Sequence, residues 1–402
     1  MKLKFISTII AAAFIASCAS PERDIIQENI ANAEVQLSAL VEASEVGDTI
    51  RIPSTYQNGQ IKFVPKDDWV SGFFAGTLWY MYELTGDEKW AEHAQKHTEN
   101  LDELQWLTWH HDVGFMVYDS YGNGRRLKNI QSYDTVLVNT AKSLSTRFRE
   151  NAGVIQSWNT ERGWQSKRGW TCPVIIDNMM NLELLFKASE ISGDPTFRNI
   201  AISHADKTYE NHYRDDFSTF HVVDYDLETG KVLGRCTAQG YADDSAWARG
   251  QAWSIYGYTV AYRFTGDEKY LQRAKDVENF IFNDENMPED LVPYWDFDAP
   301  NIPNEPKDVS SAAIIASALY ELYWYTSDKS YRAEADKIIE SLSTPEYRAE
   351  QGTNGGFILM HSVGSIPHES QIDVPLNYAD YYFLEALIRK GRIDKGENPI
   401  LR

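Results

Sequence analysis

The sequence predicts an all-α fold, a double ring of helices called an (α/α)6 barrel, with one small β-hairpin. Three observations support this prediction. Segments that are apolar on nearly all sides alternate along the chain with charged, amphipathic segments. The same turn motif recurs between the two kinds of segment, and strand-like alternation is scarce. Because a helix that is apolar all round is buried, six such helices alternating with more exposed ones fit an inner ring inside an outer ring.

The turn motif is a Gly-Asp pair with an aromatic residue three positions after the Asp. It occurs in LTGDEKW (84–90), ISGDPTF (191–197) and FTGDEKY (264–270), with a degenerate copy in YTSDKSY (325–331). Glycine suits the left-handed position that ends a helix, and Asp suits the N-cap of the next helix. We therefore expect a hairpin of two helices at each copy.

Six segments are apolar enough for the inner ring: residues 71–84, 134–148, 177–190, 247–264, 310–325 and 376–390. Polar groups stand where four of them begin: Asp67-Asp68-Trp69, Asp177, Asp243-Asp244-Ser245 and Ser310-Ser311. Helices that all start at one end of a ring would gather these groups around one mouth, although each group could also be an independent N-cap. The hairpin is expected within residues 220–234, around Glu228-Thr229-Gly230.

The first 17 residues have the form of a secretory signal peptide, with two lysines before an apolar run too short to span a bilayer. The run ends in Ile-Ala-Ser-Cys, which resembles the bacterial lipobox, where Cys18 is lipidated; the alternative is an ordinary signal peptide with an incidental cysteine. We expect a signal peptide at 1–17, a lipid-anchored segment with the first outer helix at 18–60, and the barrel domain at 61–402. The protein would then be exported and anchored to a bacterial membrane, facing the periplasm.

Composition narrows the class of ligand. The formal net charge is −21, which argues against nucleic acid as a partner. Aromatic residues make up 13% of the chain, with 12 Trp and 23 Tyr, and aromatic faces stack on sugar rings, so carbohydrate is the first expectation; a large aromatic core is the alternative. Cys172 and Cys236 could form a disulfide or stay free, and they are too few for a zinc site of the usual spacing.

Asp177 is the first candidate for chemistry. In VIIDNMMN (174–181) it separates an apolar run from a helical pattern. Apolar surroundings disfavour a charged carboxylate and should raise its pKa. A carboxyl group that keeps its proton near neutral pH can act as a general acid. The alternative, compatible with the first, is that Asp177 caps the helix.

Asp112, in HHDVGF (110–115), is the second candidate, although a His-Asp pair beside Gly114 could be turn chemistry alone. Two carboxylates such as Asp112 and Asp177 are what glycoside chemistry usually needs. In QGYADDSAWARGQAW (239–253), Arg249 and Trp253 are four residues apart and can share one helix face, whereas Trp247 and Arg249 cannot. Arg249 is expected either to pair with Asp243 or Asp244 or to clamp a sugar or carboxylate.

The sequence lacks the motifs of serine hydrolases, of phosphate-binding loops and of zinc proteases. The sequence has no GxSxG elbow, no glycine-rich phosphate loop and no HExxH pair. Its histidines lack the carboxylate arrangement of a metal site. The residues alone therefore give no argument for a metal site.

Together, HHDVGF, VIIDNMMN, HVVDYD (221–226) and QGYADDSAWARGQAW resemble the unsaturated glucuronyl hydrolases of glycoside hydrolase family 88. The opening WVSGFFAGTLWYMYELTGD (69–87) agrees, and the resemblance runs from about Asp67 to Arg389. It implies an (α/α)6 barrel without a cofactor. It also implies substrates left by polysaccharide lyases, which carry a 4,5-unsaturated uronate at the non-reducing end. The protein would be a monomer or a homodimer.

The resemblance also implies roles for particular residues. Asp177 corresponds to the general acid/base that protonates C4 of the uronate before water adds at C5. Asp112 corresponds to the second essential carboxylate, and we expect it to stay charged and to raise the pKa of Asp177. The residues expected to bind the substrate are His221, Gln239, Arg249, Trp253, Trp69, Ser362 and Ser365.

Two departures from the family pattern bear on the substrate. Ala238 stands where members often have His, and Pro367 replaces the Lys that follows the two serines in HSVGSIPHES (361–370). The second departure argues against a sulfated hexosamine of chondroitin type and leaves the sulfated rhamnose of ulvan open. Two alternatives remain: an unsaturated rhamnogalacturonyl hydrolase acting on pectin fragments, and a lipid-anchored glycan-binding protein without activity.

Overall fold

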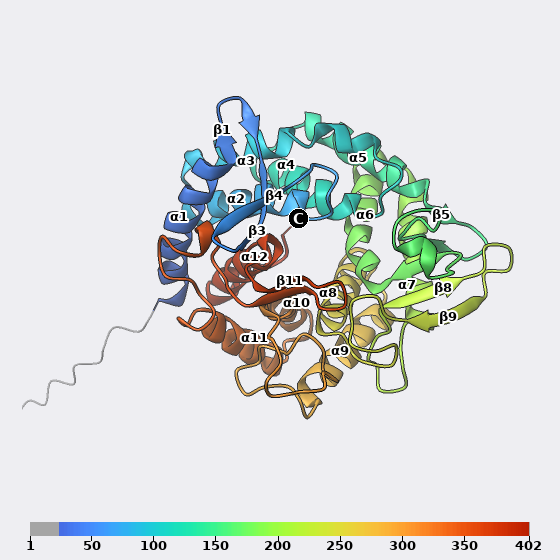
Figure 1. Cartoon of the computed structure of the whole chain (residues 1–402). Coiled ribbons are helices and arrows are strands. Elements are labelled where there is room, and N and C mark those ends of the chain that lie inside the picture. The colour runs from blue at the N-terminus through green and yellow to red at the C-terminus, as the bar shows by residue number, and fades with distance from the viewer. Residues whose placement is uncertain (1–23, 402) are drawn as a thin grey trace, which may run out of the picture.

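The computed structural model describes residues 24–401, and they form the expected (α/α)6 barrel (Figure 1). The inner ring consists of α2 (Ser71–Thr85), η2 (Gly114–Gly122) with α4 (Asn123–Lys128), η4 (Ile176–Asn181) with α6 (Leu182–Ser192), α8 (Ala248–Thr265), α10 (Val309–Thr326) and α12 (Asn377–Asp394). The outer ring consists of α1 (Ile25–Ser44), α3 (Glu88–Glu99), α5 (Ser132–Ser145), α7 (Pro195–Asn211), α9 (Glu268–Asn283) and α11 (Lys329–Leu342). Each inner element contacts the next, and α12 returns to α2, which closes the ring.

One inner segment differs from the sequence prediction. Residues 134–148 were expected in the inner ring, but α5 alternates buried and exposed residues and lies outside. The inner place belongs to η2, a π-helix of nine residues. Its glycines hide it from a pattern search and allow close packing, since a Cβ on Gly114 would lie 2.5 Å from the Asn181 side chain. The other five inner segments are confirmed.

The turn motif works as the sequence predicts. Gly86, Gly193 and Gly266 end their helices in the left-handed conformation, and Ser327 does so in the degenerate copy. The Asp that follows each of them accepts a hydrogen bond from a backbone N–H in the first turn of the next helix. These four hairpins fix the order of inner and outer helices.

Strands are short and lie in the connections between helices. The expected hairpin is present as β8 (Val222–Tyr225) and β9 (Val232–Cys236), and β7 (Pro173–Ile175) pairs with β8 to make a three-stranded sheet. Four further two-stranded sheets were not foreseen: β1 (Glu45–Val46) with β2 (Thr49–Ile50), β3 (Ile52–Gln57) with β4 (Gln60–Val64), β5 (Phe148–Arg149) with β6 (Val154–Ile155), and β10 (Ser362–Ser365) with β11 (Ser370–Val374). Short 3-10 helices η1 (Asp102–Trp106), η3 (Gln165–Lys167) and η5 (Asn354–Gly356) complete the elements.

The expected domain boundary at residue 60 is wrong, because β3 and β4 pair across it. The expected signal peptide and Cys18 lie outside the described residues. Within residues 24–401, no helix is both long and apolar enough to cross a bilayer. Cys172 and Cys236 are free thiols.

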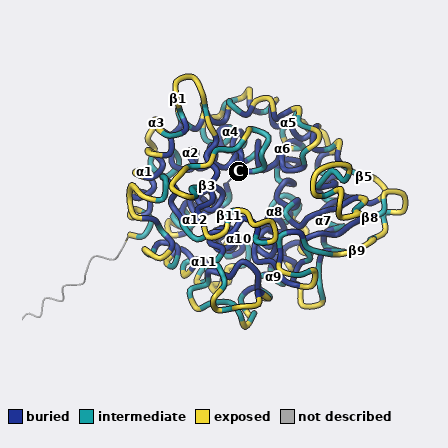
Figure 2. The backbone as a smooth tube through the Cα atoms, viewed as in Figure 1, coloured by how far each residue is buried: buried dark blue, intermediate teal, exposed yellow. Residues whose placement is uncertain are grey.

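Burial follows the two rings. The inner helices are buried on nearly every side, whereas the outer helices alternate buried and exposed residues (Figure 2). An aromatic cluster that includes Phe73, Phe115, Trp253 and Tyr382 fills the inside of the ring, with ring centroids 5.2–6.0 Å apart. This cluster forms the floor of the site described next.

Candidate active site

Asp177 lies where strand β7 passes into the 3-10 helix η4. The strand is held to the hairpin, and the Ile176 N–H donates to the His221 carbonyl at 3.0 Å. The N-terminal residue before η4 is Ile175, and no side chain caps this end. Asp177 therefore does not cap the helix, which corrects the capping alternative. Its Oδ2 atom is buried and has no hydrogen-bond partner among the described residues.

The pKa of Asp177 is raised, as the sequence predicts. Burial is the main cause, and the nearby charge of Arg249 opposes it, so the pKa is about 7. The side chain keeps 13% exposure, although its Oδ2 atom is buried. An acid of this strength can hold a proton for transfer near neutral pH.

His221 faces Asp177 as a neutral hydrogen-bond donor. Its Nδ1 accepts the backbone N–H groups of Ala238 and Gln239 at 3.1 and 3.2 Å, so the ring proton sits on Nε2. Burial and the charge of Arg249 lower the pKa of His221 well below its usual value. Nε2 lies 3.7 Å from Asp177 Oδ2, too far for a hydrogen bond. The N–H is buried and has no hydrogen-bond partner among residues 24–401, and it lies next to the acid.

Asp112 lies just before the π-helix η2, and its carboxylate is also buried. Asn181 Nδ2 donates to Oδ1 at 3.0 Å, and His111 Nε2 lies 3.2 Å from Oδ2. Burial raises the pKa of Asp112 to about 8, with a further rise from the charge of Asp177. The expectation that Asp112 stays charged and raises the pKa of Asp177 does not hold, because burial raises the pKa of Asp112 itself and the raised pKa of Asp177 comes from its own burial.

Arg249 is fixed by groups that the sequence did not point to. Nη1 donates to Asp308 Oδ2 at 3.0 Å and to the Val363 carbonyl, and Nη2 donates to the Gly364 carbonyl at 2.6 Å. The expected partners Asp243 and Asp244 are exposed. Asp308 caps α10 and was missed because it comes from the loop before that helix.

Two further predictions are wrong: that Trp247 and Arg249 lie on different faces, and that Ser310 and Ser311 line the mouth. The guanidinium stacks on Trp247, 4.6 Å from the ring centroid; Trp247 is the N-cap of α8, so helical spacing does not apply to it. Ser310 and Ser311 do not line the mouth, because both hydroxyls donate to Asp308. The start of α10 therefore supports Arg249, whereas Asp177 at the start of η4 lies at the site itself.

The aromatic candidates form the floor and one side of the site. Trp253 is fully buried, and its ring lies 5.2 Å from that of Phe115. Its indole N–H lowers the pKa of Asp177, against the larger effect of burial. Trp69 is half-buried and lies 4.9 Å from Tyr378. Gln239 Nε2 is 3.4 Å from the Gly364 carbonyl, so Gln239 borders the same strand as Arg249.

The two serine candidates lie on β10. Ser362 is fully buried, so a sugar could reach its hydroxyl only if the strand moved. Ser365 Oγ is 2.7 Å from His368 Nδ1. His368 in turn lies 4.9 Å from the ring of Trp164. Ser365 therefore contributes to the mouth together with a histidine that the sequence reasoning did not single out.

A tryptophan cluster at the mouth was also missed. The Trp158 ring lies 5.9 Å from His221 and 6.5 Å from His111, and so it borders both carboxyls. Trp164 and Trp170 lie 5.0 and 5.4 Å from Trp158. Three tryptophans within residues 158–170 were a signal in the sequence that could have revealed this cluster.

His110, His111 and Asp112 offer ligand atoms that lie within 4.8 Å of one another, which is the spacing of a possible metal site. However, His110 Nδ1 accepts the Asp112 backbone N–H at 3.1 Å, which occupies one of the lone pairs that a metal would need. The two rings are stacked 5.2 Å apart. The simpler role of these histidines is to hold Asp112 in place.

Comparison with known proteins identifies the family of the chain. No family model matches the chain. An unsaturated glucuronyl hydrolase of Formosa agariphila is 47% identical over 331 residues, which are 82% of each chain. An unsaturated chondroitin disaccharide hydrolase of Streptococcus agalactiae is 32% identical over 90% of this chain and 91% of that one. The crystal structure of an unsaturated glucuronyl hydrolase specific for heparin superimposes with a TM-score of 0.89 at 44% identity, covering 93% of this chain and 99% of the other. The chain therefore belongs to the unsaturated glucuronyl hydrolases.

Proposed function

We propose that this protein removes a 4,5-unsaturated uronate from the non-reducing end of an oligosaccharide by adding water across the C4=C5 double bond. The observation that carries the proposal is the buried carboxyl of Asp177, whose pKa is about 7 and whose Oδ2 has no hydrogen-bond partner among residues 24–401. A carboxyl of this kind can donate its proton to a substrate atom, because no protein group accepts that proton. The names of the relatives favour this reaction over pectin hydrolysis and over binding without chemistry.

In the first step Asp177 donates its proton to C4 of the alkene, and positive charge develops at C5 and the ring oxygen. The carboxylate left on Asp177 then takes a proton from a water molecule, whose oxygen bonds to C5. The resulting hemiketal opens, and the next sugar leaves with its oxygen protonated. One molecule of water is consumed, and Asp177 recovers its proton. A single carboxyl thus serves as acid and then as base.

The neighbouring groups prepare this step. The His221 Nε2–H binds a substrate oxygen beside the acid, and Asp112, protonated in the free site, holds a hydroxyl or the water by hydrogen bonding. Arg249 is held by Asp308 and two carbonyls, so its charge attracts the uronate without pairing directly with Asp177. The rate at low substrate concentration should fall as the pH rises through about 7, because the acid loses its proton; the apparent values belong to the pair of carboxyls.

The test is Asp177→Asn, assayed by the loss of ultraviolet absorbance of the unsaturated uronate. We expect kcat to fall by about 10²–10⁴-fold, the usual range for a general acid. Asp244→Asn is the matched control, since Asp244 is an exposed acid outside the site, and it should keep full activity. Full activity in the Asp177 variant would overturn the assignment.

For the sugar next to the uronate, the proposal is a sulfated residue from ulvan or a glycosaminoglycan. Trp158, Trp164 and Trp170 offer stacking faces at the mouth. Arg168 lies 4.7 Å from the Trp170 ring and supplies positive charge that an acidic substituent needs. One relative is named for chondroitin and one for heparin, so the class of neighbouring sugar varies among these proteins.

A panel of lyase-generated disaccharides with and without sulfate tests this choice. Arg168→Gln should raise KM for the sulfated members at least several-fold and leave the unsulfated members unchanged. Lys167→Gln, at the neighbouring exposed position, is the control. An equal change for both kinds of disaccharide would reject the role of Arg168.

The proposal for location is export with a lipid on Cys18, facing the periplasm. Its support is the sequence of residues 1–18 alone. In a bacterial host, the wild-type protein should fractionate with membranes and the Cys18→Ala variant should not. Release of both proteins into the soluble fraction would reject the anchor.

A further inference from the structure

A second cavity lies inside the barrel, beneath the aromatic floor of the site. Its volume is about 310 Å³, and its lining runs from Phe115 and Met180 to Lys187 and Leu401. Phe115 also packs against Trp253 in the floor. Because Asp177 precedes α6 and Lys187 lies within it, the cavity extends away from the mouth toward the opposite end of the barrel.

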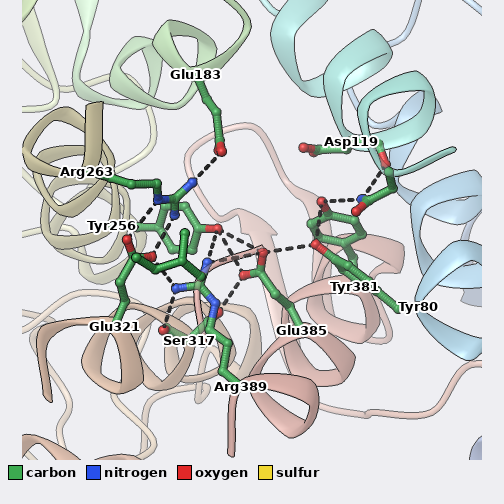
Figure 3. A network of polar contacts seen from close by, with 12 residues as sticks. Tyr80, Asp119, Glu183, Tyr256, Arg263, Ser317, Glu321, Tyr381, Glu385 and Arg389 are labelled. Atoms are coloured by element: carbon green, nitrogen blue, oxygen red, sulfur yellow. Dashed lines mark hydrogen bonds and ion pairs between the residues drawn. The ribbon is translucent and has the colours of Figure 1, made fainter. Parts of the chain in front are cut away.

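Ion pairs join the charged groups around this cavity, and Figure 3 shows those of Arg263 and Arg389 with their glutamates. Ion pairs join Arg263 to Glu183 and Glu321, Arg389 to Glu321 and Glu385, and both Arg126 and Arg392 to Glu83. Nearer the rim, Arg125 pairs with Asp134, and Lys187 pairs with Glu190. The Arg263 and Arg389 cluster has three acids for its two bases, and the Glu83 cluster has one acid for its two bases. Counted together with the two pairs at the rim, acids and bases are equal in number, so the network as a whole carries no net charge when all its groups are ionised.

Asp119 is the acid left over. It lines the cavity and is 9% exposed, and its Oδ2 is buried without a hydrogen-bond partner among the residues that the structure describes. Burial, and then the charges of Glu183 and Glu385, raise its pKa well above the usual range, against a hydrogen bond from Tyr381. Asp119 stands on η2, and π-helical turns are often found at functional sites.

The remaining walls are aromatic. Phe115, Tyr118, Tyr256, Tyr381 and Tyr382 line the same cavity as Asp119. Aromatic faces attract cations, and an ammonium group offers three hydrogen-bond donors. Asp119 holds its proton in the free cavity, and a positive charge beside its unpartnered oxygen would favour the ionised form. The aromatic walls favour a cation that carries an apolar body.

We propose that this inner cavity binds a small organic monocation of the primary-ammonium class, with the ammonium paired to Asp119 and the alkyl part packed against the tyrosine rings. The site is separate from the uronate mouth, since the floor of Phe115 and Trp253 lies between them. It is also independent of the reaction proposed above.

Calorimetric titration of the full-length protein with propylammonium chloride tests the proposal, with sodium chloride and potassium chloride at the same ionic strength as references. We expect saturable binding and a rise in Tm with propylammonium only. Asp119→Asn should weaken binding by about tenfold or more, because it removes the charge and keeps the shape. Asp177→Asn should bind as the wild type does, since its carboxyl lies at the mouth.

A second measurement needs no variant. If Asp119 gives up its proton when the cation binds, the heat of binding must change with the ionisation enthalpy of the buffer. No saturable binding, equal affinity in the Asp119 variant, equal binding of sodium or potassium ions, or loss of binding in the Asp177 variant would each overturn the proposal. A buffer-independent heat would overturn the pairing with Asp119.

Discussion

Glu321 in the inner network and Asp177 at the mouth are both buried near an arginine, yet their pKa values move in opposite directions. Burial would raise the pKa of Glu321, but Arg263 and Arg389 bind it directly and lower the pKa to about 2. The charge of Arg249 also lowers the pKa of Asp177, but burial prevails and the pKa is about 7.

The difference lies in what each arginine binds. Arg263 and Arg389 give their N–H groups to Glu321 itself. Arg249 gives three of its N–H groups to Asp308 and two carbonyls. A guanidinium whose N–H groups bind other partners still acts on a nearby acid through its positive charge, but it donates no hydrogen bond to that acid. A buried acid beside it can therefore keep its proton. The mouth can therefore hold a positive charge for an anionic sugar beside a protonated acid.

The largest expected effect is a loss in the free energy of unfolding when Glu321 is replaced. Glu321→Gln leaves Arg263 and Arg389 buried with less countercharge, and removal of one partner from such a network costs about 3–5 kcal/mol. Urea unfolding measures the loss. Glu340→Gln, at an exposed position on α11, should change stability by no more than about 0.5 kcal/mol. A loss below about 1 kcal/mol for Glu321→Gln would mean that the pairing contributes little.

A smaller effect of opposite sign is expected at the mouth. A carboxyl whose pKa is raised by folding binds more protons in the native state, so its contribution to stability is lost as the pH rises from about 4 to about 7. As the pH rises through this range, the folded protein must bear the cost of an ionised, buried carboxylate. Asp177→Asn removes that cost, because an amide does not ionise. Relative to wild type, the variant should gain a few kcal/mol between these pH values.

Unfolding of the two proteins by urea across this pH range measures the gain. Asp244→Asn is again the control and should show a difference from wild type that is flat with pH. If the free energy of unfolding of the Asp177→Asn variant changed with pH in the same way as that of wild type, burial would not destabilise the ionised carboxyl of Asp177. The contrast with Glu321 would then be wrong.

Sequence reasoning reached the parts of this molecule that local patterns determine. The Gly-Asp turns and five inner helices follow from residues close together in the chain. It also singled out Asp177, Asp112, His221 and Arg249 from distinctive motifs, and the structure brings these residues close together. It placed 134–148 in the wrong ring because η2 is a glycine-rich π-helix without a helical pattern.

Partners that are distant in sequence could not be predicted. Asp308 meets Arg249 across 59 residues, and Gly364 does so across 115. The raised pKa values of Asp112 and Asp177 come from burial, which no spacing reveals. The inner network joins residues from several helices of the ring, so its charge balance exists only once the barrel has closed.

The smallest expected effect concerns the indole N–H of Trp253. This group lowers the pKa of Asp177 although it has no partner within hydrogen-bonding distance in residues 24–401. Trp253→Phe should therefore move the alkaline limb of the kcat/KM profile upward by less than about one pH unit, which corresponds to less than about 1.4 kcal/mol. The plateau at lower pH is the internal control, because loss of packing lowers the plateau without moving the limb. A limb that moves downward would mean that Trp253 shields Asp177 from water more than it stabilises the carboxylate.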